Sequence, residues 1–193
     1  MEYCSMGKIK NGYIVIKNIL TKEEQLLLQH YTDIKHRFNT KNFDNGGQSD
    51  QMDTCYYEDA LMEALLLSKQ SLMERATNLK LFPTYSFWRM YTYCATLAKH
   101  TDRNACEISV TINIAGDGTK WPIYIGNSEV NLDPGDGVIY EGIDYEHWRN
   151  EYLGDGQAQV FLHYVDQNGK YSDWKYDKRG GIGYPPTFTR YEI

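Results

Sequence analysis

Residues 97–102 of this chain read LAKHTD, and residues 144–149 read DYEHWR, with several short strand-like segments between them. The first stretch holds a His-x-Asp pair, His100 and Asp102, whose side chains would point the same way along a strand. The second stretch supplies His147. Two imidazoles and one carboxylate can occupy one face of an octahedral iron, and the same set suits a catalytic zinc. We therefore predict that these three residues bind one divalent metal ion.

The sequence around these residues changes its hydrophobic period near residue 86. Before that point, a capping box at Thr21–Glu24 opens an expected helix at 22–33, and an apolar stripe predicts a second helix at 57–79. After it, apolar residues alternate with a period of two, and Gly- and Asp-rich turns separate the segments. The expected strands are 86–94, 106–115, 121–126, 137–141, 145–148 and 157–165. This order is typical of an α+β, mainly β fold, in which the helices buttress an antiparallel sandwich or barrel.

A chain of 193 residues is expected to form a single domain over 1–193. We divide it into a helical leader at 12–80, a strand-rich core at 86–166 and an irregular C-terminal arm at 167–193. The polar stretch 38–54 is expected to be a long loop. It is either a solvated connector or a flap over the active site.

Composition limits the partners and the compartment. The formal net charge of −6 makes non-specific nucleic-acid binding unlikely. No apolar run has the length of a membrane span, and the first residues lack the regions of a signal peptide. The four cysteines are scattered without a CxxC pair, which favours free thiols in a reducing cytoplasm, although a disulfide stays possible. We therefore expect a cytoplasmic protein.

Several motifs of the chain resemble one enzyme family. They are Tyr91-Thr92-Tyr93, the LAKHTD stretch, residues 106–114, the Gly135-Asp136-Gly137 turn before the strand of the distal histidine, and the closing strand at 160–166. Together they are similar to the iron(II)- and 2-oxoglutarate-dependent dioxygenases, and more narrowly to the prolyl-4-hydroxylase-like branch. The likeness covers residues 86–166, with 12–31 similar to the usual leader.

The resemblance implies a double-stranded β-helix, or jelly roll. It implies that Fe(II) binds His100, Asp102 and His147, with 2-oxoglutarate and O2 as cosubstrates. The reaction would be hydroxylation of an unactivated C–H bond. The acidic surface suggests an amino acid, a peptide or a small metabolite as substrate.

The sequence departs from the family at the closing strand. Relatives usually place an Arg or Lys there, about ten residues after the distal histidine, to hold the far carboxylate of 2-oxoglutarate. Here residues 156–159 read GQAQ. Glutamine can hydrogen-bond a carboxylate but cannot neutralise it. The cation must therefore come from another element.

Arg149 is the favoured cation, because two residues after His147 it would share that face of a strand. Arg89, Lys99 and Arg103 are the alternatives. Strand alternation sets Gln159, Thr111 and Asn113 on polar faces, which we place inward as neutral partners of the cosubstrate; the alternative is that these faces meet water. Tyr91 completes the expected cosubstrate residues. Arg103, directly after the aspartate, is the expected substrate-binding residue for an acidic group.

Two other functions stay open. A jelly roll can also be a non-catalytic, cupin-like module that binds a metal or a ligand, since a fold does not determine function. A metal-dependent isomerase or hydrolase could use the same three residues without 2-oxoglutarate.

Overall fold

The computed structural model describes residues 9, 12–38 and 53–185. It contains two α-helices, ten strands and two short 3-10 helices, η2 and η3, within these residues. In chain order they are β1 Tyr13–Ile16, α1 Lys22–Phe38, β2 Thr54–Tyr57, α2 Ala60–Thr77, β3 Leu81–Thr92, β4 Leu97–His100, η2 Asn104–Cys106, β5 Ile108–Gly116, β6 Ile123–Ile125, β7 Ser128–Val130, β8 Gly137–Tyr140, β9 His147–Arg149, β10 Gly156–Asp166 and η3 Ser172–Lys178. No helix among the described residues is long and apolar enough to cross a membrane.

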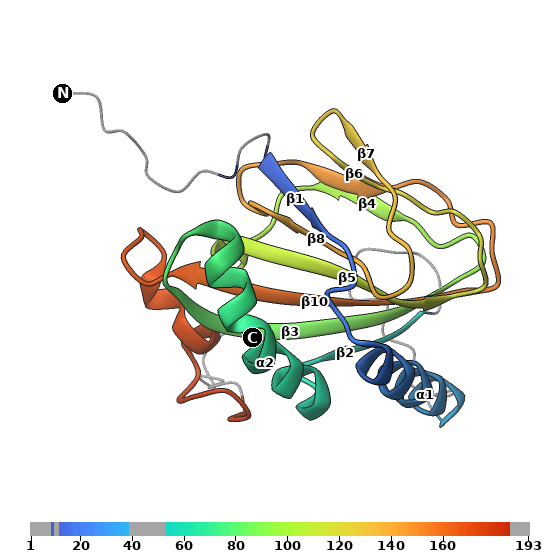
Figure 1. The fold of residues 1–193 in the computed structure, drawn as a ribbon, viewed down its shortest axis with the longest axis horizontal. Coiled ribbons are helices and arrows are strands. Elements are labelled where there is room, and N and C mark those ends of the chain that lie inside the picture. The colour runs from blue at the N-terminus through green and yellow to red at the C-terminus, as the bar shows by residue number, and fades with distance from the viewer. Residues whose placement is uncertain (1–8, 10–11, 39–52, 186–193) are drawn as a thin grey trace, which may run out of the picture.

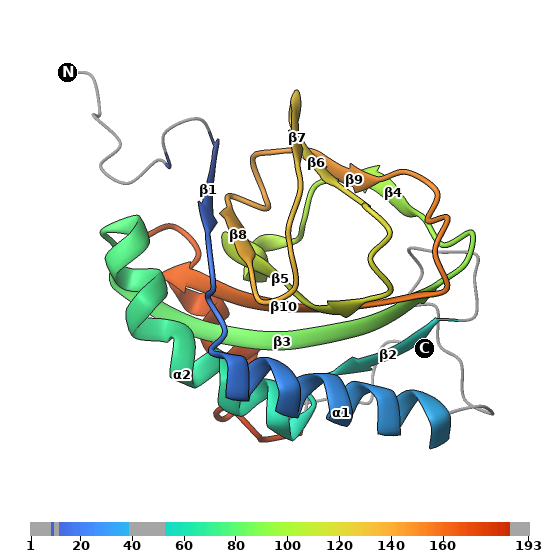
Figure 2. The ribbon, with the colours of Figure 1, turned by 45° about the vertical axis from the view of Figure 1, so that its right-hand side comes forward.

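The strands form two antiparallel sheets that face each other (Figure 1). The major sheet has the order β1-β8-β5-β10-β3-β2, and the minor sheet has the order β4-β9-β6-β7. Figure 2 shows α1 and α2 on one side of the major sheet and the minor sheet on the other. The predicted α+β, mainly β architecture with buttressing helices is confirmed.

Local sequence explains where the helices begin and end. The predicted capping box opens α1: the backbone N–H of Glu24 donates to the Thr21 hydroxyl, and the Glu24 carboxylate accepts from the Thr21 N–H. Asp59 caps α2 by accepting from the N–H of Leu61, and Asn78 ends it in the left-handed conformation that asparagine tolerates.

The period of two gives the major sheet one apolar and one polar face. The apolar face packs against the helices through side chains such as Trp88, Ile112 and Val160, each fully buried. The opposite face carries Thr111, Asn113 and Gln159, which are also buried, because the minor sheet covers them. The polar faces therefore point inward, as the alternation predicts, and line the interior between the sheets.

Several predicted boundaries are wrong. Helix α1 runs on to Phe38, beyond the expected end at 33, since Lys35, His36 and Arg37 in its last turn interrupt the apolar pattern, and β3 begins at Leu81 rather than at 86. The expected helix at 57–79 begins only at Ala60, after Tyr57 has closed the unpredicted strand β2. Strand β7 was also unpredicted, and β4, the strand assumed to carry both His100 and Asp102, ends at His100. Most of the expected loop at 38–54 lies outside the described residues.

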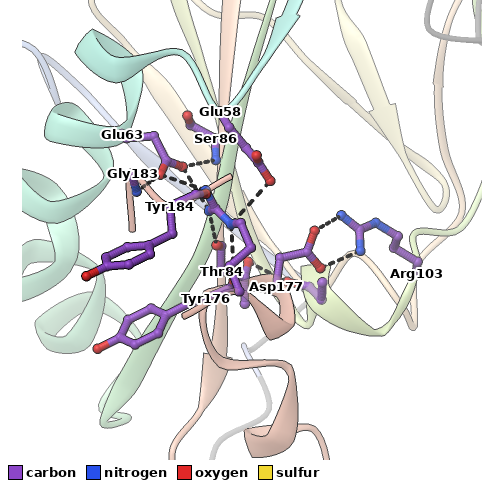
Figure 3. Close-up of polar contacts among 11 residues, drawn as sticks. Glu58, Glu63, Thr84, Ser86, Arg103, Tyr176, Asp177, Gly183 and Tyr184 are labelled. Carbon is purple, nitrogen blue, oxygen red and sulfur yellow. Dashed lines mark hydrogen bonds and ion pairs between the residues drawn. The ribbon is translucent and has the colours of Figure 1, made fainter. Parts of the chain in front are cut away.

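The described part of the C-terminal arm lies against β3 and α2, and a buried ion pair anchors it (Figure 3). Arg179 makes two bonds to the Glu63 carboxylate, at 3.1 and 3.2 Å, and a third to the carbonyl of Thr84 at 2.9 Å. Three consecutive residues before it, 176–178, have left-handed backbones. They carry Asp177 toward Arg103, next to the candidate metal ligand Asp102.

Candidate metal centre

The three predicted metal ligands meet at one end of the interior between the sheets. His100 is the last residue of β4 and His147 the first of β9, and the two stand directly opposite each other in the antiparallel pair. Asp102 lies beyond the end of β4, so its position does not come from strand spacing; its backbone N–H donates to the carbonyl of Gly142 at 2.8 Å. The donor atoms of the three side chains all lie within 4.8 Å of one another.

Backbone contacts orient both imidazoles for metal binding. The Nδ1 of His100 is 2.7 Å from the carbonyl of Ala98, and that of His147 is 3.0 Å from the carbonyl of Tyr145. A carbonyl only accepts, so each Nδ1 carries a proton, and Nε2 is the nitrogen of each ring that faces Asp102 and would bind a metal once it has given up its proton. Both Nε2 atoms lie 3.5 Å from Oδ1 of Asp102. Metal-binding histidines are commonly held in this way.

The electrostatics keep the aspartate ionised. Burial alone would raise the pKa of the Asp102 carboxyl, but hydrogen bonds from His100 and His147 outweigh it and hold that pKa well below its usual range. The Asp102 hydrogen bond also raises the pKa of His100, against the opposing effect of burial. An ionised carboxylate beside two imidazoles is a ready ligand set for a divalent cation.

A small pocket opens beside the three ligands, with a cavity of about 50 Å³. Apart from the ligands, its wall is mostly aromatic: it contains Tyr57, Tyr85, Phe87, Leu97, Tyr140, Phe161 and His163. Burial lowers the pKa of His163 to about 4, so its imidazole is neutral at neutral pH. Such a wall excludes water from the metal and presents little charge to a substrate.

Arg149 lies inside the same interior, two residues after His147 on β9. Its side chain donates to the carbonyl of Trp121 at 2.6 Å and stacks on the Trp121 ring, with the guanidinium carbon 4.7 Å from the ring centroid. Its Nε and Nη2 have no hydrogen-bond partner among the described residues. Burial lowers the pKa of Arg149 to about 10, but the side chain stays a cation at neutral pH.

The other expected cosubstrate residues share this interior. Tyr91 is fully buried, packs edge-on against Trp121 at 4.8 Å, and its hydroxyl has no partner within the described chain. Gln159 accepts from the Thr111 hydroxyl at 3.4 Å, and its own Nε2 is unpartnered. Asn113 donates to the carbonyl of Leu132 at 2.9 Å and leaves its Oδ1 unpartnered.

The alternative cations are held by carboxylates. Arg89 forms a fully buried ion pair with Asp53 at 3.0 Å, and Lys99 pairs with Glu146 at 2.8 Å on the surface. Arg103 makes two bonds to the Asp177 carboxylate, at 2.6 and 2.7 Å (Figure 3). It also lies over the Tyr85 ring.

Several residues of the site gave no signal in the sequence. Trp121 and Tyr140 flank Arg149 and His147, but aromatic residues are too common in this chain to stand out. Gly142 allows the close approach of Asp102, and only the folded loop reveals this. Ser109 and His163 sit on the predicted polar faces of β5 and β10, and that alternation was the one signal that could have found them.

No family model matches the sequence, and no curated protein sequence matches it. Solved structures do. The chain is similar to SnoK, a non-heme alpha-ketoglutarate-dependent carbocyclase from nogalamycin biosynthesis, with a TM-score of 0.66 and 11% identity over 80% of this chain and 79% of that one. It is similar to a prolyl-4-hydroxylase from Pseudomonas putida, with a TM-score of 0.62 and 11% identity over 80% and 92% of the two chains.

A third similar structure is a prolyl hydroxylase from Trichoplax adhaerens, solved with a peptide fragment of the hypoxia-inducible factor oxygen degradation domain. Its TM-score is 0.62, with 17% identity over 82% of this chain and 85% of that one. At such identities the likeness establishes the fold, which is the double-stranded β-helix that the sequence resemblance implied. The chemistry has to be argued from the residues of this chain.

Proposed function

We propose that this protein is an iron(II)- and 2-oxoglutarate-dependent oxygenase with His100, Asp102 and His147 as its metal ligands. The donor set supports this, because two imidazoles and one carboxylate on one face suit a non-heme iron(II) with open positions. The orientation of both Nε2 atoms toward Asp102 supports it as well. Bound iron and 2-oxoglutarate would supply the oxidising chemistry with O2 as the oxidant: one oxygen atom would enter succinate as the cosubstrate loses CO2, and the other would hydroxylate an unactivated C–H bond.

One observation carries the choice of 2-oxoglutarate: the interior between the sheets holds buried donors without hydrogen-bond partners among the described residues, including two nitrogens of Arg149, two residues after His147. Within the described residues, Nε and Nη2 of Arg149, the Tyr91 hydroxyl and Nε2 of Gln159 are all sequestered and unpartnered. Leaving such groups unbonded costs about 1–3 kcal/mol each, and more for a charged group. A carboxylate placed among them would satisfy them together and would be neutralised by Arg149.

The chain's own residues would divide the work as follows. Arg149 would bind the far carboxylate of 2-oxoglutarate, with Tyr91, Gln159, Thr111 and Asn113 as the neutral polar groups around it. The aromatic wall of the pocket would exclude water from the metal. Arg103 is the proposed substrate-binding residue, and an acidic substrate group would have to compete with Asp177 for it.

The proposed substrate is an amino acid, a peptide or a small metabolite, acted on in the cytoplasm. The aromatic pocket supports a compact group at the metal. The similar structures support this range, because one of them holds a peptide fragment and another comes from the biosynthesis of a natural product.

The test is cosubstrate turnover by the full chain. Anaerobic addition of Fe(II) and then 2-oxoglutarate is expected to give a visible metal-to-ligand charge-transfer band, and oxygen is expected to release succinate slowly even without substrate. The His147→Ala variant should lose both signals, whereas His36→Ala, on the outer helix α1, should keep them. Metal binding without any 2-oxoglutarate signal would favour the cupin-like binding module, or an isomerase or hydrolase, over the oxygenase.

A further inference from the structure

Two buried residues of the major sheet form a chain of hydrogen bonds that ends on Asp102, the proposed metal ligand. Ser109 on β5 stands directly opposite His163 on β10, and its hydroxyl lies 2.8 Å from Nδ1 of His163. The same hydroxyl lies 3.4 Å from Oδ2 of Asp102. Oδ1 of that carboxylate faces the two histidines, so Oδ2 is the oxygen that faces away from them.

Counting protons gives this chain of contacts a direction. The ionised carboxylate only accepts, so the Ser109 hydroxyl must donate to it for the contact to be favourable. The hydroxyl then has no second proton for His163, so Nδ1 of the neutral imidazole must be the donor to Ser109. The Ser109 oxygen also lies 3.2 Å from the carbonyl of Cys106, which competes for the same proton. The donation from His163 polarises the hydroxyl and favours its bond to the carboxylate.

Backbone also packs closely against Oδ2 of Asp102. Gly142 lies so close that a Cβ placed there would be 2.3 Å from Oδ2 of Asp102. Its carbonyl accepts the Asp102 N–H at 2.8 Å. Oδ2 of Asp102 therefore has two close neighbours, the backbone of Gly142 and the hydroxyl of Ser109. Of these two, the Ser109 hydroxyl is the group that can donate a hydrogen bond to Oδ2.

A purely structural role does not explain an imidazole at position 163. His163 is 5% exposed and packs against the Tyr85 ring, with centroids 4.5 Å apart, where an aromatic hydrocarbon would fill the same space. Burying a polar ring costs free energy unless its nitrogens are bonded. Within the described chain the bond to Ser109 is the one hydrogen bond that the ring makes.

We propose that Ser109 and His163 are positioning residues that fix the Asp102 carboxylate in its metal-binding orientation, through the chain His163 Nδ1–H to Ser109 O–H to Asp102 Oδ2. The inference rests on the proposed function only in taking Asp102 as a metal ligand. Neither residue belongs to the proposed set of metal ligands. Their effect is to remove the rotational freedom of the carboxylate before the metal arrives.

The experiment titrates the full chain with cobalt(II) alone, whose visible absorption reports the ligand geometry, and measures thermal unfolding of the same samples. Ser109→Ala and His163→Phe are expected to weaken cobalt binding roughly 10- to 100-fold, the usual effect of losing a group that orients a metal ligand. Both variants should also change the shape of the cobalt spectrum. His163→Asn, whose side-chain amide can donate from the place of Nδ1, should restore most of the affinity.

Ser86→Ala is the matched control. Ser86 is also a buried serine of the major sheet, but its hydroxyl has no partner among the described residues. This variant should bind cobalt like the parent protein.

Parent-like cobalt affinity and spectrum in both Ser109→Ala and His163→Phe would overturn the inference while leaving the metal centre intact. So would an equal loss of affinity in Ser86→Ala, because it would show a general effect of core damage. A parent protein that binds no cobalt would instead refute the proposed metal centre, and the inference with it. If His163→Phe fails to fold, Ser109→Ala alone decides.

Discussion

Replacing Arg149 by glutamine tests the charge that the proposed cosubstrate requires. Arg149 is buried between the sheets, with one hydrogen bond to the Trp121 carbonyl and two nitrogens without partners among the described residues. The variant removes the cation and leaves His100, Asp102 and His147 in place. It should therefore separate binding of 2-oxoglutarate from binding of the metal.

The ligand-free protein should change little in stability. Burial lowers the pKa of Arg149 from its usual value to about 10, which corresponds to a penalty of roughly 3 kcal/mol for the buried cation. Because the folded-state pKa is the lower one, this penalty is fully present below about pH 10 and disappears as the pH rises above the pKa that arginine has in the unfolded chain. Glutamine removes it. The variant also loses the bond to Trp121, about 1.5–3 kcal/mol, and the cation–π contact, about 0.5–2 kcal/mol, so the two effects nearly cancel.

The liganded protein should lose most of its added stability. Hydrogen bonds to a charged group are worth about 1.5–3 kcal/mol, so 2-oxoglutarate should bind about 10- to 150-fold more weakly to the variant. For a domain of this size, 1 kcal/mol corresponds to about 2–4 °C in Tm. The increase in Tm caused by saturating 2-oxoglutarate should therefore be about 3–12 °C smaller in the variant than in the parent protein. If the increase in the parent protein is itself smaller than this loss, the variant should show no increase at all.

The assay is thermal unfolding under anaerobic conditions with manganese(II), with and without 2-oxoglutarate. Manganese binding by the variant should match that of the parent. Lys99→Gln, which removes an exposed cation paired with Glu146, is the matched control and should keep the full 2-oxoglutarate shift. An Arg149→Gln variant with an undiminished shift, together with an Arg89→Gln variant that has none, would show that Arg89 is the cation and that this reasoning is wrong.

Two further predictions concern the loop around Asp102 and the C-terminal arm. Gly142→Ala should weaken cobalt(II) binding in a titration by at least about tenfold, because the new Cβ would stand 2.3 Å from Oδ2 of Asp102 and displace it. Gly156→Ala is the control, since a Cβ there would make only ordinary van der Waals contacts, and it should bind cobalt like the parent protein. Equal cobalt affinities of the two variants would refute the close approach of Gly142 to Asp102. Glu63→Gln should lower the Tm in a thermal scan by about 6–20 °C, because breaking a buried pair such as that with Arg179 costs about 3–5 kcal/mol. Asp173→Asn, in an exposed pair, should have almost no effect, and similar Tm values for the two variants would contradict the anchoring role.

The core of the fold could be predicted because it depends on local periodicity, and the three proposed metal ligands, chosen for their residue types and spacing, do lie together. Strand alternation in β5 and β10 correctly assigned Thr111, Asn113 and Gln159 to inward faces. It failed for Asp102, which lies beyond the end of β4 and is placed by its bond to the carbonyl of Gly142. The spacing His-x-Asp was informative, but the reason first given for it, a shared strand face, is not the one that the structure shows.

Other features depend on contacts between distant residues and leave no local pattern. Strand β2, Thr54–Tyr57, exists because it pairs with β3, and its four residues are too few to show a period. The ion pair of Arg103 with Asp177 joins residues 74 positions apart. Sequence spacing singled out Arg103 because it follows Asp102, but it could not show that the Asp177 carboxylate already holds the guanidinium.

Under the proposed function, Arg149 would supply the positive charge that the closing strand lacks for a dicarboxylate. The two sheets enclose one interior, so a charge can enter it from β9 of the minor sheet as well as from β10 of the major sheet. Gln157 and Gln159 on β10 then need to supply only neutral hydrogen bonds. Two residues on a strand lie about 7 Å apart along it, a span that a short dicarboxylate can bridge between His147 at the metal and Arg149. Metal and cosubstrate would thus share one three-residue strand, so changes to the backbone of β9 should affect both, whereas changes to the Arg149 side chain should affect only the cosubstrate.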